Sequence, residues 1–138
     1  MIKAVLDRQL MISVNNDVGM LAAVTSVITS TGINLLANCA YAIDNRAAFM
    51  FVTDDNNAAK KLLESHNVNV QEQEVILLSI DNKPGVLRAV TDKMAETGID
   101  LTLMYGSVDP GAEVARLVLV AKNNLDVMML IKTELERS

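Results

Sequence analysis

Two short polar loops in this chain carry the residues best suited to bind a small molecule. The first reads Asn15-Asn16-Asp17-Val18-Gly19, and the second reads Asp81-Asn82-Lys83-Pro84-Gly85. Each loop precedes a segment with helical spacing of apolar residues, so the backbone N–H groups of a helix N-terminus can receive a carboxylate. Glycine has no Cβ and permits close approach, while a carboxylate such as Asp17 can hold an ammonium group. The loops therefore suit a ligand that carries both charges.

The same residues also have a purely structural interpretation. Asn and Asp in front of a helix commonly act as N-caps, and glycine is commonly present for its backbone conformation. The two loops also differ in charge, because Lys83 takes the position of Asp17. The sequence leaves open whether both loops bind a ligand or only one of them does.

The two loops belong to an internal repeat. Residues 14–35 align with residues 80–101 at an offset of 66, and ten of the 22 aligned positions are identical. Two copies at so long a period indicate duplicated small domains and not a solenoid. We expect one unit over residues 7–72 and a second unit over residues 73–138.

Each copy has the same predicted order of elements. An apolar strand leads into the loop, and a helix follows that ends at Gly32 or Gly98, both expected in a left-handed conformation. Two strands joined by a hairpin turn come next, and Asn56 and Asn123 are predicted N-caps of a second helix. A final strand at 68–72 completes the first copy. This βαββαβ order predicts an α+β, ferredoxin-like fold with both helices on one face of an antiparallel sheet.

The second copy ends without a final strand of its own. At the same offset, Ile2–Leu6 aligns with residues 68–72. An uncovered strand edge invites pairing, so we expect residues 2–6 to fill the vacant edge of the second unit, within the chain or across a dimer. The alternative is that this segment only extends the strand that follows it.

Composition and charge exclude several classes of protein. The 138 residues are 51% hydrophobic, which supports a packed core, and the net charge is -5 with no basic cluster. This charge argues against nucleic acid and anionic membranes as partners. The chain has no apolar run of the roughly 20 residues that a membrane span needs. With Cys39 as its single cysteine, it forms no intrachain disulfide, which indicates a reducing cytoplasm.

The sequence offers little that could perform catalysis. It shows no nucleophile with a nearby base, no metal-ligand spacing and no phosphate loop, so we expect no enzyme, no metal site and no cofactor. We expect the single histidine, His66, to be solvated and Cys39 to be a small core residue. Asp54 and Asp55 are expected to complement the dipole of the helix that follows them.

The repeated motif resembles the ACT domain. An apolar strand is followed by Asn/Asp-x-x-Gly-x-Leu, then Ala-Val-Thr, then a helix that ends in Thr-Gly-Ile-Asn/Asp-Leu. The resemblance covers essentially the whole chain as a tandem pair, and copy one departs from it with Val18 where copy two has Pro84. It implies amino-acid sensing at interfaces between ACT units. The positions that it assigns to the ligand are Asn15, Asn16, Asp17, Val18, Gly19, Met20, Leu21 and Asn34 in copy one, and Asp81, Asn82, Pro84, Gly85, Val86, Leu87 and Asp100 in copy two.

Two functions follow as alternatives. The first is a regulatory or sensor protein that binds an amino acid and forms a homodimer. The second is a non-catalytic subunit that assembles with a metabolic enzyme and makes no use of its ligand loops. Neither the identity of the amino acid nor that of a regulated enzyme can be derived from the sequence.

Overall fold

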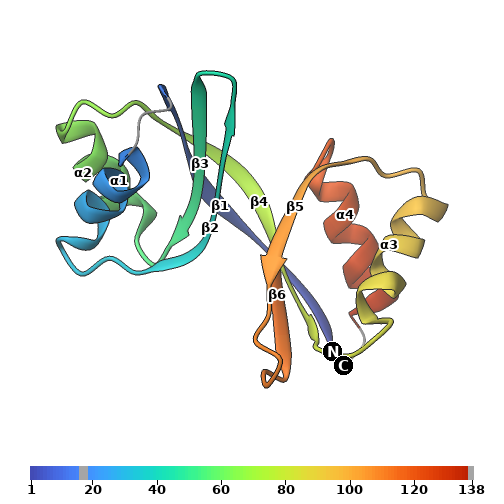
Figure 1. Ribbon diagram of the computed structural model, residues 1–138. Coiled ribbons are helices and arrows are strands. Elements are labelled where there is room, and N and C mark those ends of the chain that lie inside the picture. Colours follow the sequence, from blue (N-terminus) through green and yellow to red (C-terminus); the bar gives the residue numbers. More distant parts are fainter. Residues whose placement is uncertain (16–18, 137–138) are drawn as a thin grey trace. The chain divides into compact units, whose positions relative to one another are not determined.

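The computed structural model describes residues 1–15 and 19–136 (Figure 1). Three of the predicted ligand residues, Asn16, Asp17 and Val18, lie outside the described residues. The prediction of an α+β fold is confirmed, because the structure has one antiparallel sheet in the strand order β2-β3-β1-β4-β6-β5 together with four α-helices among the described residues. In chain order the elements are β1 (Ile2–Asn15), α1 (Met20–Thr29), β2 (Leu35–Ile43), β3 (Arg46–Thr53), α2 (Asn56–Ser65), β4 (Val70–Asp81), α3 (Val86–Glu96), β5 (Leu101–Ser107), β6 (Val114–Ala121), α4 (Asn124–Leu130) and a π-helical turn (Ile131–Leu135).

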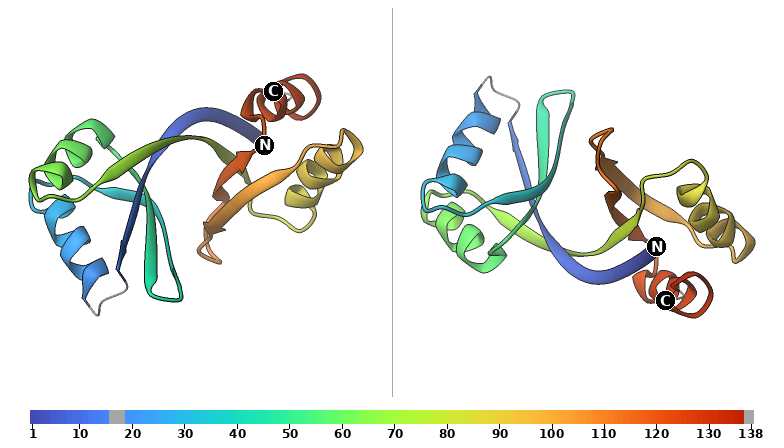
Figure 2. Two further views of the ribbon diagram at one scale, coloured as in Figure 1. Left: turned by 90° about the horizontal axis from the view of Figure 1, so that it is seen from above. Right: turned by 90° about the horizontal axis from the view of Figure 1, so that it is seen from below.

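One compact unit consists of Arg8–Gln73. Within it, β1 and β2 both pair with β3 in antiparallel fashion, and Asn15 lies opposite Arg46 at the end of the ladder. Helices α1 and α2 lie side by side on one face of these strands, as the views from above and below also show (Figures 1 and 2). Apolar side chains of alternating strand positions pack beneath the helices and bury the core, which includes Leu10, Ile12, Val24, Ile28, Phe49, Phe51 and Leu63.

The second unit combines Met1–Asp7 with Glu74–Ser138. The Asp81 N–H donates to the carbonyl of Met1 at 3.0 Å, so the first residues of β1 run along β4 in the same chain. Ala4 is fully buried in this unit's core, and Ile2 packs against it. The segment also continues without a break into the rest of β1, so one 14-residue strand contributes to both units.

The helix ends agree with the sequence except at the start of α2. Gly32 and Gly98 have φ values of +83° and +72°, which confirms their left-handed conformation. Asn123 is the N-cap of α4 and accepts a hydrogen bond from the Leu125 N–H, as predicted. The prediction for Asn56 is wrong: Asp55 is the N-cap of α2, because its carboxylate accepts from the Ala58 N–H.

A β-bulge near the start of β2 changes which side chains face the helices. Leu35 lies opposite Thr53, but Ala37 lies opposite Val52, so one additional residue is inserted. Beyond such a bulge every side chain changes face. Cys39 consequently lies opposite Met50 and is only half-buried, so the prediction of a core cysteine is wrong. The same irregularity occurs in β5 between Leu101 and Leu103.

Gly106 of β5 provides a test of how closely the strands of the second unit approach. A Cβ at Gly106 would lie 2.3 Å from Leu117 Cδ2 and 2.8 Å from the Arg116 carbonyl oxygen. Because the backbone itself must shift, Gly106→Ala is expected to lower the free energy of unfolding by about 1–3 kcal/mol. Gly111→Ala is the matched control, since nothing lies within 4 Å of its Cβ. Equal denaturant midpoints for the two variants would contradict this packing.

Candidate functional site

Both predicted ligand loops lead into helices that begin in the same unusual way. Gly19 and Gly85 are the N-caps of α1 and α3, with φ values of +92° and +88°, and neither helix has a side-chain cap among the described residues. The carbonyl of each glycine accepts the N–H of the residue four positions ahead, Ala23 or Ala89. Within residues 1–15 and 19–136, no side-chain oxygen therefore caps the N–H groups of either first helical turn, and a helix N-terminus without such a cap can bind an anion.

The four described apolar residues that were predicted to surround the ligand differ in how far their side chains are exposed. Met20 packs against the core of the first unit, and Val86 and Leu87 pack against the core of the second. Leu21 is 41% exposed on α1. Of these four side chains, Leu21 is thus the one that the structure leaves most available to a ligand. Pro84 is exposed directly in front of the Gly85 N-cap.

In the first unit, the Asn15 side chain is held by an arginine. Arg46 Nη1 donates to Asn15 Oδ1 at 2.9 Å, and Nη2 donates to Ser13 Oγ at 3.1 Å. Both strand positions are fixed by the β1–β3 ladder, in which Asn15 lies opposite Arg46. Sequence analysis did not identify Arg46. The sequence signal that could have identified it is a charged residue directly after the Asp44-Asn45 turn. Copy two has the apolar Val114 at the corresponding position.

In the second unit, the side chains of Asp81 and Asn82 are engaged by other protein groups. The ammonium group of Met1 donates to the Asp81 carboxylate, and this hydrogen bond, together with the charges of that ammonium and of Lys83, holds the pKa of Asp81 below its ordinary value despite opposing desolvation. Asn82 donates from its side chain to the Ala112 carbonyl at 2.8 Å and from its backbone to the Glu113 carbonyl. These hydrogen bonds of Asn82 hold the second loop against the segment before β6.

The two predicted residues at the start of the second strands lie far from the loops of their own units. Asn34 directly precedes Leu35, which pairs with Thr53, whereas Asn15 pairs with Arg46 at the other end of β3. Seven residues of extended strand span about 23 Å. Asp100 stands in the same relation to Asp81 along β6. Within one unit, the structure does not bring Asn34 or Asp100 together with the helix start.

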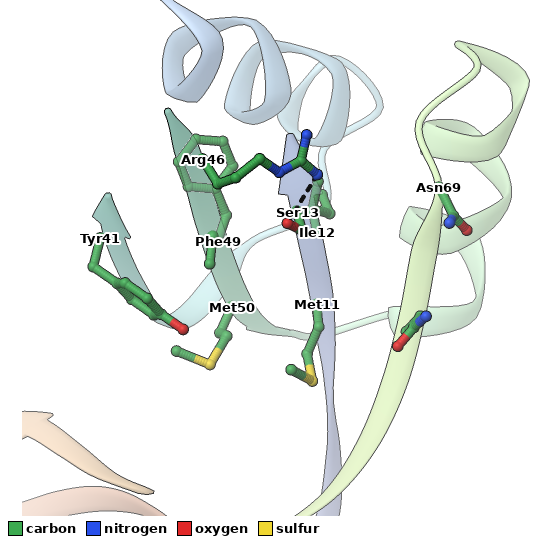
Figure 3. Close-up of a pocket in the computed structure, with 10 residues that line it drawn as sticks. Met11, Ile12, Ser13, Tyr41, Arg46, Phe49, Met50 and Asn69 are labelled. Atoms are coloured by element: carbon green, nitrogen blue, oxygen red, sulfur yellow. Dashed lines mark hydrogen bonds between the residues drawn. The ribbon is translucent and has the colours of Figure 1, made fainter. Parts of the chain in front are cut away.

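Sequence analysis missed a hollow of about 340 Å³ on the face of the first unit's sheet that points away from α1 and α2. Four neighbouring strands line it, and Figure 3 shows Arg46 reaching across to Ser13 above Met11 and Met50. The bulge in β2 turns Tyr41 towards the same face, opposite Ala48. Its lining residues are Met11, Ile12, Ser13, Tyr41, Arg46, Ala48, Phe49, Met50, Asn69 and Gln71.

The part of the chain that the structure describes contains neither a candidate metal site nor a candidate membrane helix. No group of three or more His, Cys, Asp or Glu side chains is placed to hold a metal ion in residues 1–15 and 19–136. In the same part of the chain, no helix is both long and apolar enough to cross a bilayer.

The chain is similar to several proteins of known structure. Protein BT0572 from Bacteroides thetaiotaomicron is 27% identical, with a TM-score of 0.86 over 94% of this chain and 88% of that chain. The ligand-free regulatory subunit of aspartate kinase from Thermus thermophilus is 16% identical, with a TM-score of 0.65 over 96% and 97% of the two chains. The corresponding subunit from Thermus flavus is also 16% identical, with a TM-score of 0.59 over 95% and 94%. The likeness to the two Thermus proteins is one of fold.

Sequence comparison assigns the family directly. No curated protein matches this chain. The profile described as "ACT domain pair", however, matches residues 5–132, nearly the whole chain, and spans both helix-start loops. The repeated motif, the strand order in each unit and this match agree. The chain belongs to the ACT domain pair family.

Proposed function

We propose that this protein is a non-catalytic regulatory module that binds a free amino acid at the loops before α1 and α3. The observation that carries the proposal is the pair of helix starts at Gly19 and Gly85, which have no side-chain cap among the described residues. Membership of the ACT domain pair family supports a regulatory role. The Thermus structures, regulatory subunits of aspartate kinase, support the idea that such a chain can act as a separate subunit.

The proposed recognition divides between backbone and side chains. The amino acid's carboxylate would accept hydrogen bonds from the first N–H groups of the helix, where the helix dipole also favours negative charge. An added Cβ at Gly19 or Gly85 would meet nothing within 4 Å, so the structure around each N-cap leaves open space. In copy one, Asp17 would hold the ammonium group. In copy two, Asp81 already contacts an ammonium group, so recognition there would rest mainly on the backbone.

The engagement of Asp81 and Asn82 also gives the alternative function a specific basis. A loop whose side chains stabilise the fold has a structural role even in a subunit that assembles with an enzyme and binds no ligand. We therefore propose that copy one binds the ligand more tightly than copy two, and we regard assembly with an enzyme without any ligand as the alternative function of the protein. We further propose that the protein forms a homodimer, in which Asn34 or Asp100 of one unit approaches the helix start of another.

A thermal-shift screen with the common amino acids tests this proposal. A ligand at about 100 times its Kd should add roughly 2.7 kcal/mol to the free energy of unfolding, which is a shift of several degrees for a chain of this size. A flat response to the whole panel would reject amino-acid binding and favour the assembly subunit. Light scattering on the same sample measures the proposed dimer.

Four glycine variants locate the site. Gly19→Ala and Gly85→Ala add a methyl group and backbone strain at the N-caps of α1 and α3, whereas Gly32→Ala and Gly98→Ala impose similar strain after the C-terminal ends of α1 and α3. All four are expected to lose roughly 1 kcal/mol of stability, because alanine disfavours positive φ. The ligand-induced shift should disappear only in Gly19→Ala, or also in Gly85→Ala if both copies bind. Loss of the shift in Gly32→Ala and Gly98→Ala as well would contradict the assignment.

A further inference from the structure

We propose that the hollow on the open face of the first unit's sheet is a second binding site, which takes a small carboxylic acid with an apolar body and no ammonium group. This site lies on the open face of the sheet and not at a helix start, and it does not depend on the proposed function, although its Arg46 also contacts Asn15 of the first loop. Its volume of about 340 Å³ lies at the lower end of the ~300–1,000 Å³ typical of small-molecule sites, which suits a metabolite.

The charge of the hollow selects an anion. The chain contains 17 Asp and Glu residues against 12 Lys and Arg residues, yet among the described residues that line the hollow the single charged side chain is Arg46. Within the described part of the chain, the guanidinium contacts the neutral oxygens of Asn15 and Ser13 and forms no ion pair. These two bonds use two of its five N–H donors, so three donors remain for a carboxylate.

The rest of the lining defines the body of the ligand. Met11 and the buried Met50 lie below Arg46 (Figure 3), and together with Ala48 they give the hollow an apolar lining. Asn69, Gln71 and the half-exposed Tyr41 also line the hollow, and their amide and hydroxyl groups can bind a neutral polar group. No carboxylate among these lining residues is available to neutralise an ammonium group. A keto or hydroxy acid with a branched apolar chain has the matching pattern.

The residues that line the hollow are not repeated at the corresponding positions of the second unit. The ladder register places Val114 and Arg116 where the first unit has Arg46 and Ala48, since Asp81 pairs with Val114 and Ser79 with Arg116. Ser107, opposite Arg116, occupies the place of Tyr41. The second unit thus has a long side chain where Ala48 leaves room, and no arginine at the rim position.

Methionine methyl signals provide a local measurement in the full-length protein. Met11 and Met50 report on the hollow, and Met20 at the start of α1 reports on the helix-start loop. The probes are the keto acid of leucine, leucine itself and the alcohol with the same branched chain but no carboxylate. We expect the keto acid to shift the Met11 and Met50 signals, leucine to bind this site at least about tenfold more weakly, and the alcohol to produce no saturable shift.

Variants distinguish specific binding in the hollow from a general effect of net charge or of protein stability. Arg46→Gln should weaken keto-acid binding by about tenfold or more, and the exposed control Lys61→Gln, with the same change in charge, should not. Ala48→Leu keeps Arg46 but fills the hollow, and should also abolish the shift. If the keto acid leaves Met11 and Met50 unchanged, or if leucine binds equally well, the proposal is wrong. Because Met20 reports the helix start independently, failure here is distinguishable from failure of the proposed function.

Discussion

Replacing Ala4 with glutamate is expected to unfold the second unit selectively, whereas the same change at the neighbouring Val5 is tolerated. Ala4 is fully buried in the core formed by β4, β6, α3 and α4, and Val5 is 43% exposed on the other face of the strand. A carboxylate at Ala4 has no partner in that core, so Ala4→Glu should cost at least about 3 kcal/mol. Val5→Glu should change the free energy of unfolding by less than about 1 kcal/mol.

Hydrogen exchange measures where the stability is lost. In Ala4→Glu, the amides of β6 should lose protection while those of β3 keep it, because β3 belongs to the unit Arg8–Gln73. Deletion of residues 1–6 should give the same pattern, since the edge of β4 then loses its neighbour. Equal loss of protection in β3 and β6 would show that residues 1–6 do not stabilise the second unit selectively, and would overturn the proposed division of the chain.

The repeat explains why so much of the fold could be predicted. Two copies of one motif define the element order twice, so an ambiguous segment in one copy is resolved by its counterpart in the other. The aligned glycines also indicated the helix boundaries, and Gly32 and Gly98 have the positive φ expected of them. Element order and turn positions depend on local sequence patterns, and such patterns can be recognised in one sequence alone.

What could not be predicted depends on strand register and on long-range pairing. The bulge in β2 reverses the faces of Cys39 and Tyr41, and period-two alternation cannot reveal an inserted residue. The Asp81 side chain contacts a group 80 positions away in the sequence, which no local pattern indicates. The hollow has the same origin, because all its lining residues except Asn69 come from four strands that become neighbours only in the sheet.

The first residue of α2 and the first residue of α4 make corresponding hydrogen bonds to two strands, and local capping rules did not predict these bonds. Asn56 Oδ1 accepts from both the N–H and the hydroxyl of Thr53, at 3.0 and 2.7 Å, and its Nδ2 donates to the Arg8 carbonyl at 2.8 Å. Asn124 repeats the arrangement, with the Ala121 N–H as donor and the Glu74 carbonyl as acceptor. In each unit, one asparagine thus joins a helix start to the strand before it and to a second strand.

Asn56→Ala is therefore expected to lower the free energy of unfolding by about 2–3 kcal/mol, because the nearly buried Thr53 loses the acceptor of both its donors. Asn56→Asp should be at least as costly, since it places an oxygen against the Arg8 carbonyl. The exposed neighbour Asn57→Ala is the matched control and should change the stability by less than about 0.5 kcal/mol. Denaturant unfolding gives these values, and hydrogen exchange should place the loss in β3 for Asn56→Ala and in β6 for Asn124→Ala. Equal stability of the Asn56→Ala and Asn57→Ala variants would show that the connection contributes nothing to the fold.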